Sequence, residues 1–190
     1  MDTGHPAPMD SLSDAELVDA ANRGGTQAFE TLYERHREWL MAVAIRLTGD
    51  RDIAADVVQD AVLYWLGRFP GFVLTGSARS YLYPLLRHSA IDRVRRAGRG
   101  GPHLAFDEAM CASPSSSPAG PEHAAELHRE LARLPLGQRE VILLHFGDGL
   151  TLADVALALG VPIGTVKSRL GLALASLRVN DRLRDRYFTP

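Results

Sequence analysis

The sequence has very little cysteine and few long apolar runs. Cys111 is the only cysteine in 190 residues, which excludes a disulfide scaffold and favours a reducing, intracellular compartment. No run of roughly 18 apolar residues occurs, and residues 1–10 carry neither a basic end nor an apolar stretch. We therefore expect no membrane-spanning helix, no secretory signal and a soluble, cytoplasmic protein.

Motifs for catalysis and for metal binding are also missing. No glycine-rich phosphate loop follows a predicted strand, since the glycines at 98, 100 and 101 follow a predicted helix. His123 and His128 lie near Glu122 and Glu126, but a solvated helix is favoured there because no cysteine or third converging ligand accompanies them. We expect no enzyme, no cofactor and no metal site.

The apolar residues, 46% of the chain, repeat with the period of a helix and never alternate over a long stretch. Helices are predicted over 12–22, capped by Ser11 or Ser13 with Glu16 in a capping box, then over about 29–48, 52–68 and 77–96. Pro84 should bend the last of these helices or mark its effective start. The helical period returns from Glu122 onward.

The fold class predicted is all-α, with two small helical bundles joined by a flexible linker. Composition sets the boundaries: a Pro-rich, disordered 1–10, a first bundle over 11–97, a Gly-, Pro- and Ser-rich linker over 98–121, a second bundle over 122–178, and a tail over 179–190.

A helix-turn-helix pattern lies at residues 151–170. Thr151 is a suitable helix cap, Gly160 suits the tight turn, and Val166 is placed to pack the second helix on the first. The second helix begins with polar and basic residues suited to phosphates and base edges. These residues are Thr165, Lys167, Ser168 and Arg169. The alternative is a plain helical hairpin inside a bundle.

Charge is distributed unevenly. Residues 1–60 hold twelve acidic residues against five arginines, whereas residues 79–99 hold six arginines against one aspartate. Four polar residues form a stripe on the predicted 52–68 helix, opposite an apolar face that includes Tyr64. The stripe residues are Asp52, Asp56, Gln59 and Asp60. Like charges four apart destabilise a helix, so a stripe kept at that cost suggests a basic protein partner. Taken alone, the segment favours a merely solvated acidic face.

The 77–96 helix combines arginines with Tyr81 and Tyr83, a pattern that suits unpaired DNA bases and their phosphates. The alternative for each tyrosine is a place in the core. Two other protein classes also fit parts of these patterns. A free-standing helix-turn-helix regulator would bind duplex DNA alone. An adaptor would bind a larger protein assembly through the acidic stripe and sequester or redirect it.

Taken together, three segments resemble the extracytoplasmic-function (group IV) sigma factors of bacterial RNA polymerase. The resemblance is carried by Leu47-x-Gly49-Asp50 with Asp56-x2-Gln59-Asp60, by Ile91-Asp92-Arg93, and most specifically by the run from Gly160 to Leu170. It implies a sigma-2 domain, a linker and a sigma-4 domain. The implied function is to bind core polymerase and direct promoter-specific initiation.

The resemblance also implies roles for particular residues. Asp52, Asp56, Gln59 and Asp60 would dock on the clamp helices of the largest polymerase subunit, and the sigma-4 domain on the β flap. The melted −10 element would be bound by Phe69, Arg79, Tyr81, Arg87, His88, Asp92, Arg93, Arg95 and Arg96. The −35 duplex would be read by Gly164, Thr165, Lys167, Ser168 and Arg169. Members often pair with an anti-sigma protein, which is a further candidate partner.

The chain departs from the family at four places. Tyr81 stands where Trp is usual and His88 where Asn is usual, and Pro84 is unusual in its helix. Late in the −35 helix, Gly171, Leu172 and Leu174 replace basic residues. Packing within the domain is favoured for the two leucines over contact with a regulator.

Overall fold

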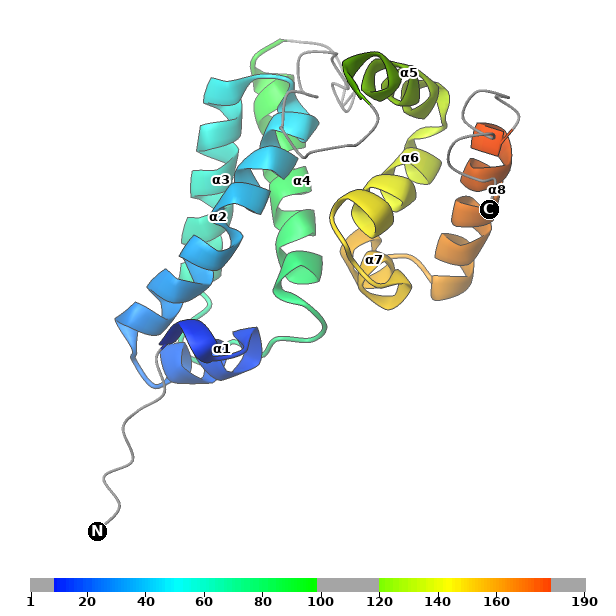
Figure 1. The fold of residues 1–190 in the computed structure, drawn as a ribbon. Helices are drawn as coiled ribbons and strands as arrows, with labels where there is room; N and C mark the ends of the chain where they lie inside the picture. The colour runs from blue at the N-terminus through cyan, green and yellow to red at the C-terminus, as the bar shows by residue number, and fades with distance from the viewer. Residues whose placement is uncertain (1–8, 99–119, 179–190) are drawn as a thin grey trace.

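The computed structural model describes residues 9–98 and 120–178, and within these residues every regular element is helical (Figure 1). In the first half, a short turn η1 (Met9–Ser11) is followed by α1 (Asp14–Asn22), α2 (Thr26–Thr48), α3 (Arg51–Leu66) and α4 (Ala78–Arg96). The second half holds α5 (Gly120–Arg133), α6 (Leu136–Ile142), the π-helical η3 (Leu143–Gly147), α7 (Leu152–Leu159) and α8 (Ile163–Arg178). The all-α prediction is confirmed.

Local sequence signals explain where the first helices begin and end. Ser13 caps α1 in a complete capping box with Glu16, as the sequence predicts. Gly49 ends α2 in the left-handed conformation, with φ of 67°, which glycine adopts at low cost. Asp50 then caps α3, since its carboxylate accepts hydrogen bonds from the backbone N–H groups of Asp52 and Ile53. Two helices are therefore separated by a two-residue break.

Helix α4 starts from the cap Ser77 and continues through Pro84 to Arg96. The alternative in which Pro84 marks the effective start of the helix is therefore wrong. Pro84 is exposed, while Tyr83 and Leu86 on either side of it are buried. The packing of these apolar neighbours explains how a helix of this length tolerates the proline.

The first half has its core between α2, α3 and α4, with α1 lying across one end of α2 (Figure 1). Leu32, Leu40, Val57, Leu82 and Leu86 are fully buried there. Tyr64 was expected on the buried face of α3, and this prediction is wrong, because Tyr64 is 54% exposed. Its neighbour Trp65 is the buried residue, because positions 57, 61 and 65 share one face at a spacing of four.

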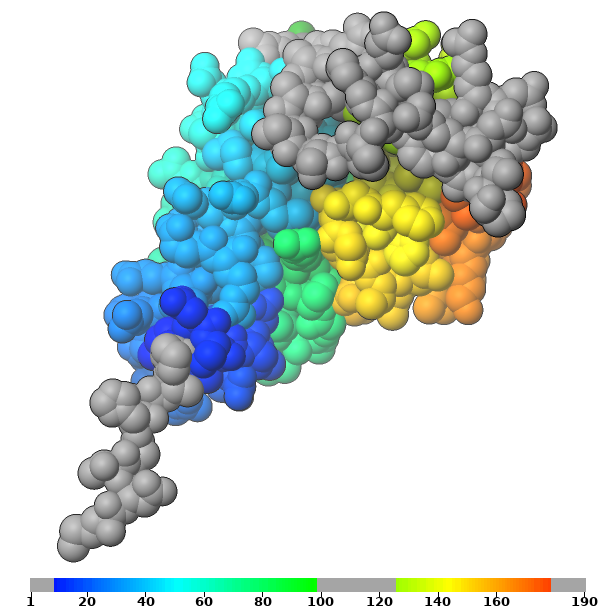
Figure 2. All heavy atoms as spheres, viewed as in Figure 1, coloured from blue at the N-terminus to red at the C-terminus, as the bar shows by residue number. Residues whose placement is uncertain are grey.

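The second half has a smaller core of its own, where Leu131, Leu134, Ile142, Ala173 and Leu177 meet between α5, α6 and α8. A second set of buried residues, including Val141, Leu144 and Val155, belongs to the same apolar cluster as the core of the first half. Helix α4 packs directly on α7. Figure 2 shows the surface of α6 and η3 (yellow) adjoining that of α2 (blue) and α4 (green). The two halves are in contact, which the sequence did not predict.

Candidate polymerase and promoter interface

The predicted acidic stripe lies on the outer face of α3. Asp52, Asp56, Gln59 and Asp60 are all exposed, and Val57 and Ala61 are buried on the opposite side. This placement agrees with the helix face predicted from the sequence spacing, because the four polar side chains lie outside the core. A basic partner surface can therefore reach them.

The stripe is nevertheless paired with a residue of α4. Arg93 donates from Nε and Nη2 to the two carboxylate oxygens of Asp60, at 2.7 and 2.9 Å, and from Nη1 to Asp56 at 2.6 Å. Ser89 adds a hydrogen bond to Asp60 at 2.9 Å. The Arg93 guanidinium holds the pKa of Asp60 below its usual value. Arg93, predicted to bind −10 DNA, thus joins that site to the predicted polymerase site.

Five aromatic rings support the segment before α4. Trp65 is fully buried, and Phe29, Phe69 and Phe72 surround it with ring centroids 5.2 to 6.4 Å away. Tyr81 extends the cluster, with its ring 4.7 Å from that of Phe72. Aromatic pairs at these distances attract each other beyond the burial of their surface. The cluster fixes where Phe69 and Tyr81, two predicted −10 residues, present their partly exposed rings.

The loop that carries Phe72 is also held by Asn22 at the end of α1. The Asn22 side-chain Oδ1 atom accepts from the backbone N–H groups of Gly71 and Phe72, at 2.7 and 3.0 Å, and its Nδ2 atom donates to the Phe72 backbone carbonyl at 2.8 Å. One amide therefore satisfies three backbone groups of the loop. Sequence reasoning missed Asn22, because residues 22 and 72 meet only in the folded chain.

The predicted −10 residues of α4 fall into two groups. His88, Arg95 and Arg96 are exposed, with Arg95 donating to Asp92 at 3.1 Å and His88 3.7 Å from Asp92. Arg79 and Arg87 instead turn toward the second half of the chain. Arg87 donates to Glu140 at 2.9 Å, and Arg79 donates to the Asp148 carbonyl at 2.7 Å while lying over the Trp39 ring.

Tyr83 is a core residue, so the core alternative is confirmed for this tyrosine. It is 2% exposed, and its hydroxyl donates to Glu140 at 3.1 Å. Burial, and next the charge of Glu140, raise the pKa of Tyr83 far above its usual value, so the ring stays neutral. Tyr81 is only partly buried, and burial raises its pKa as well.

The helix-turn-helix forms as the sequence predicts. The Thr151 hydroxyl caps α7 by accepting from the Asp154 N–H, Gly160 makes the turn with φ of 64°, and Val166 is fully buried. Helices α7 and α8 meet at 107°, within the range typical of this motif. Gly164, Lys167 and Ser168 are exposed and Thr165 is partly buried, so the start of α8 offers polar groups to a ligand.

Arg169 differs from its neighbours, because its guanidinium lies against Gly137 of α6. A Cβ atom built on Gly137 would lie 3.0 Å from the Arg169 Cζ atom. Farther along α8, Leu174 packs on the small core of the second half, as expected, whereas Leu172 is 56% exposed. The prediction that Leu172 packs is therefore wrong.

The described residues contain no group of three or more His, Cys, Asp or Glu side chains arranged to hold a metal ion. Cys111 and the His123 and Glu122 side chains lie outside the part that the structure describes. In the described ranges no single helix has the length and apolarity to cross a membrane, and the bent pair α7 and α8 passes on combined length and composition alone.

Comparison with known proteins assigns both halves of the chain. Residues 32–100 match the family model "Sigma-70 region 2", and residues 124–177 match "Sigma-70, region 4". The chain is 33% identical over 165 residues to "ECF RNA polymerase sigma factor SigM" of Mycobacterium tuberculosis, covering 87% of this chain and 83% of that protein.

Solved structures agree. CnrH, solved in complex with the cytosolic domain of CnrY, superposes with a TM-score of 0.61 at 25% identity, covering 87% of this chain and 95% of that one. The sigma factor RpoE of Bartonella quintana, solved with the anti-sigma factor NepR, has a TM-score of 0.60 at 24% identity, covering 85% and 99% of the two chains. At 24% identity, the likeness to RpoE shows that the two chains share a fold.

A region-2 bundle with an exposed acidic helix, followed by a region-4 helix-turn-helix, defines a sigma-type transcription factor. This chain belongs to the extracytoplasmic-function sigma factors of the sigma-70 family, and it directs promoter-specific transcription by RNA polymerase. The resemblance identified in the sequence is confirmed. The family assignment favours this function over a free-standing regulator and over an adaptor.

Proposed function

We propose that this chain is a non-catalytic polymerase subunit that acts in the cytoplasm and binds its partners through four surfaces. The stripe Asp52, Asp56, Gln59 and Asp60 on α3 docks on the basic clamp helices of core polymerase. The second half of the chain meets the β flap. The observation that carries the proposal is the 107° helix-turn-helix, because it leaves Lys167 and Ser168 exposed at the start of α8, where a major groove can be read.

The −10 element is the proposed ligand of α4 and of the loop before it. Phe69 and Tyr81 offer partly exposed rings held by a buried aromatic cluster, while Arg95, Arg96 and His88 supply cationic and polar groups nearby. Stacking of an unpaired base on a ring contributes about 1–3 kcal/mol, comparable with the few kcal/mol lost when a base leaves the duplex. Strand opening at this site therefore needs no nucleotide hydrolysis.

Core polymerase, promoter DNA and an anti-sigma protein are the proposed partners. Support for the first two comes from the family assignment and the charges of α3, α4 and α8. Support for the third is the fold shared with CnrH, which was solved with the cytosolic domain of CnrY. Pull-down with purified core polymerase tests the first partner directly.

Run-off transcription on a genomic fragment library, with bacterial core polymerase and mapped RNA 5′ ends, tests the division of work. The wild-type chain should produce new starts that share a −35 and a −10 sequence. Lys167→Ala with Ser168→Ala should lose these starts while retaining core binding, and Asp56→Ala with Asp60→Ala should lose both.

The matched control is Arg37→Ala, which removes an exposed cation of α2 that pairs only locally with Glu34. It should leave start sites and core binding unchanged. Starts that persist in the Lys167 and Ser168 variant would contradict the assignment of α8, and unchanged core binding in the Asp56 and Asp60 variant would contradict the assignment of α3.

A further inference from the structure

A single side chain of α1 anchors the loop that joins α3 to α4, residues 67–77. The Asn22 Oδ1 atom accepts from the backbone N–H groups of Gly71 and Phe72, and its Nδ2 atom donates to the Phe72 carbonyl, at 2.7 to 3.0 Å. The backbone of residues 71–75 lies outside any helix and, within the described part of the chain, makes no hydrogen bond except these three. The path of this stretch therefore depends on Asn22.

The anchored loop also delivers an aromatic ring to the core. Phe72 is 7% exposed, and its ring centroid lies 6.3 Å from that of Trp65 and 4.7 Å from that of Tyr81. The ring of Phe69 lies 5.3 Å from it as well. Phe72 thus contacts both of the rings that are proposed to stack on unpaired −10 bases. If Phe72 moved, Phe69 and Tyr81 would each lose a ring that holds them in place.

Asn22 acts on the loop and offers little to a ligand of its own. It is the last residue of α1 and is partly buried. An asparagine amide has two donor hydrogens and one oxygen with two lone pairs, so three of its four hydrogen-bonding positions are already used by the loop. Any effect of Asn22 on DNA binding must therefore be transmitted through the loop.

A fixed loop favours binding of an unpaired base for an entropic reason. Ordering a flexible backbone opposes binding, whereas a loop that is already ordered in the free chain loses little further freedom when a ligand arrives. Without Asn22, residues 71–75 would have to be ordered during binding itself. The affinity for an unpaired strand should then fall, while contacts made by other elements should keep their strength.

We propose that Asn22 is a positioning residue for the capture of unpaired −10 bases. It fixes the backbone of the loop, and the Phe72 ring in turn holds Phe69 and Tyr81. Helix α1 thereby takes part in strand capture without a DNA contact through this residue. The proposal rests on the proposed function, because that function assigns the two rings to the melted −10 strand. Docking through α3 and reading of the −35 duplex by α8 do not depend on Asn22.

Two measurements on the free, full-length chain test the anchoring. Amide hydrogen exchange followed by NMR should be about tenfold faster at the Phe72 N–H in Asn22→Ala than in the wild type, because this N–H loses its acceptor. In a Trp39→Phe background, acrylamide should quench Trp65 more strongly in Asn22→Ala, because Phe72 covers that ring less well. Unchanged exchange together with unchanged quenching would overturn the anchoring.

Strand binding by the complex with core polymerase tests the consequence for DNA. The probe is a fluorescent single strand that carries the −10 sequence of a start mapped by run-off transcription. Asn22→Ala should bind it about tenfold more weakly than the wild type, with unchanged affinity for core polymerase. Asn22→Asp keeps an acceptor for the two N–H groups and loses the donor, so it should bind with intermediate affinity and keep the Phe72 N–H protected. Protection without any recovery of strand binding would overturn the positioning role.

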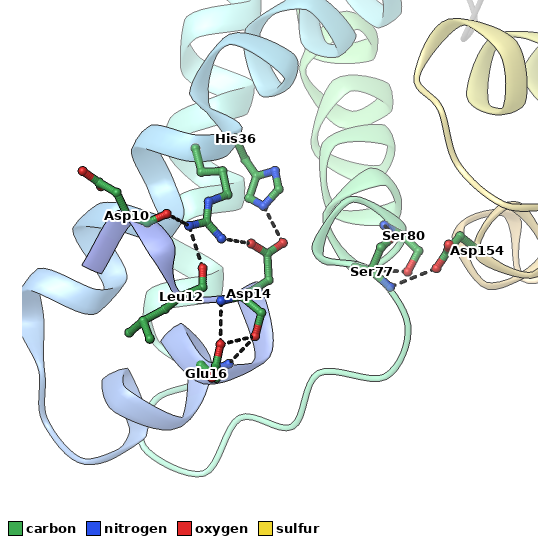
Figure 3. Close-up of polar contacts among 10 residues, drawn as sticks. Asp10, Leu12, Asp14, Glu16, His36, Ser77, Ser80 and Asp154 are labelled. Carbon is green, nitrogen blue, oxygen red and sulfur yellow. Dashed lines mark hydrogen bonds and ion pairs between the residues drawn. The ribbon is translucent and has the colours of Figure 1, made fainter. Parts of the chain in front are cut away.

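Asp14→Asn is the matched control, because Asp14 joins the other end of α1 to His36 of α2 at 2.8 Å, away from the loop (Figure 3). It should destabilise the first half and leave both strand affinity and Trp65 quenching unchanged. If Asp14→Asn lost as much strand affinity as Asn22→Ala, a general loosening of α1 would explain the result and the proposal would be overturned. Mapped starts with wild-type strand affinity in Asn22→Ala would overturn this proposal alone, whereas the absence of any mapped start would overturn the proposed function and the capture role with it.

Discussion

Arg93 joins the proposed polymerase-binding stripe of α3 to the proposed −10 site of α4. Its removal should therefore affect stability and polymerase binding in opposite directions. Its side chain is 29% exposed, and the partners Asp60 and Asp56 are 46% and 56% exposed. Exposed ion pairs contribute about 0.2–1 kcal/mol each. The bidentate contact with Asp60 places the stabilisation by these ion pairs near the upper end of that range, and solvent screening keeps it from exceeding it. Arg93→Ala should therefore lower the free energy of unfolding by about 1 kcal/mol.

The same substitution should strengthen docking on core polymerase. If the clamp helices bind the stripe as proposed, their cation competes with Arg93 for Asp56 and Asp60. Removing Arg93 should then make binding to the partner more favourable by up to the same free energy. About 1 kcal/mol corresponds to roughly fivefold tighter binding. Asp60→Ala should weaken binding, because it removes the carboxylate itself.

Two assays measure these effects. Urea unfolding followed by circular dichroism gives the stability change, and fluorescence anisotropy with core polymerase in the absence of DNA gives the affinity. The Arg37→Ala variant, which removes a local surface pair, controls for a general loss of positive charge. If Arg93→Ala weakened core binding as much as Asp60→Ala does, Arg93 would be a positioning residue for the carboxylates, and the competition argument would be refuted.

Three other substitutions probe the elements that support the site. Trp65→Ala should lower the free energy of unfolding by about 3–5 kcal/mol, because Trp65 is fully buried among three aromatic rings. A urea midpoint close to that of the wild type would show that the cluster is dispensable. Gly160→Ala should lower the free energy of unfolding by about 1 kcal/mol. The reason is the backbone φ of 64° alone, since open space surrounds the position. A melting temperature higher than that of the wild type would contradict this prediction. Asp14 accepts hydrogen bonds from His36 and Arg35, as Figure 3 shows for His36, and these lower its pKa from 3.8. Because the pKa of Asp14 is lower in the folded chain, its ionised carboxylate stabilises the fold above pH 3.8, and this stabilisation is lost as the pH falls below that value. Asp14→Asn should therefore lower the free energy of unfolding by about 1–2 kcal/mol at pH 7, and by progressively less below about pH 4. Urea titrations at several pH values that give a constant difference would count against this linkage.

The sequence by itself determined the local structure of this protein. Capping by Ser13 and Thr151, the turns at Gly49 and Gly160 and the burial of Val166 depend on near neighbours in the chain, so their patterns could be recognised directly. The acidic stripe of α3 was predicted for the same reason, since a spacing of three or four residues fixes one helix face. The family's signature run from Gly160 to Leu170 then assigned the function.

Only the tertiary structure decided how these elements meet. The bridge from Arg93 to Asp56 and Asp60 spans 37 and 33 residues, and the contact of Arg46 with Asp148 spans 102. Such pairs are chosen by the packing of whole helices, which leaves no periodic trace in the sequence. Periodicity also allowed either Tyr64 or Trp65 on the buried face, because spacings of three and of four from Ala61 both return to that face. The packing of Trp65 against three phenylalanine rings decided which of the two is buried.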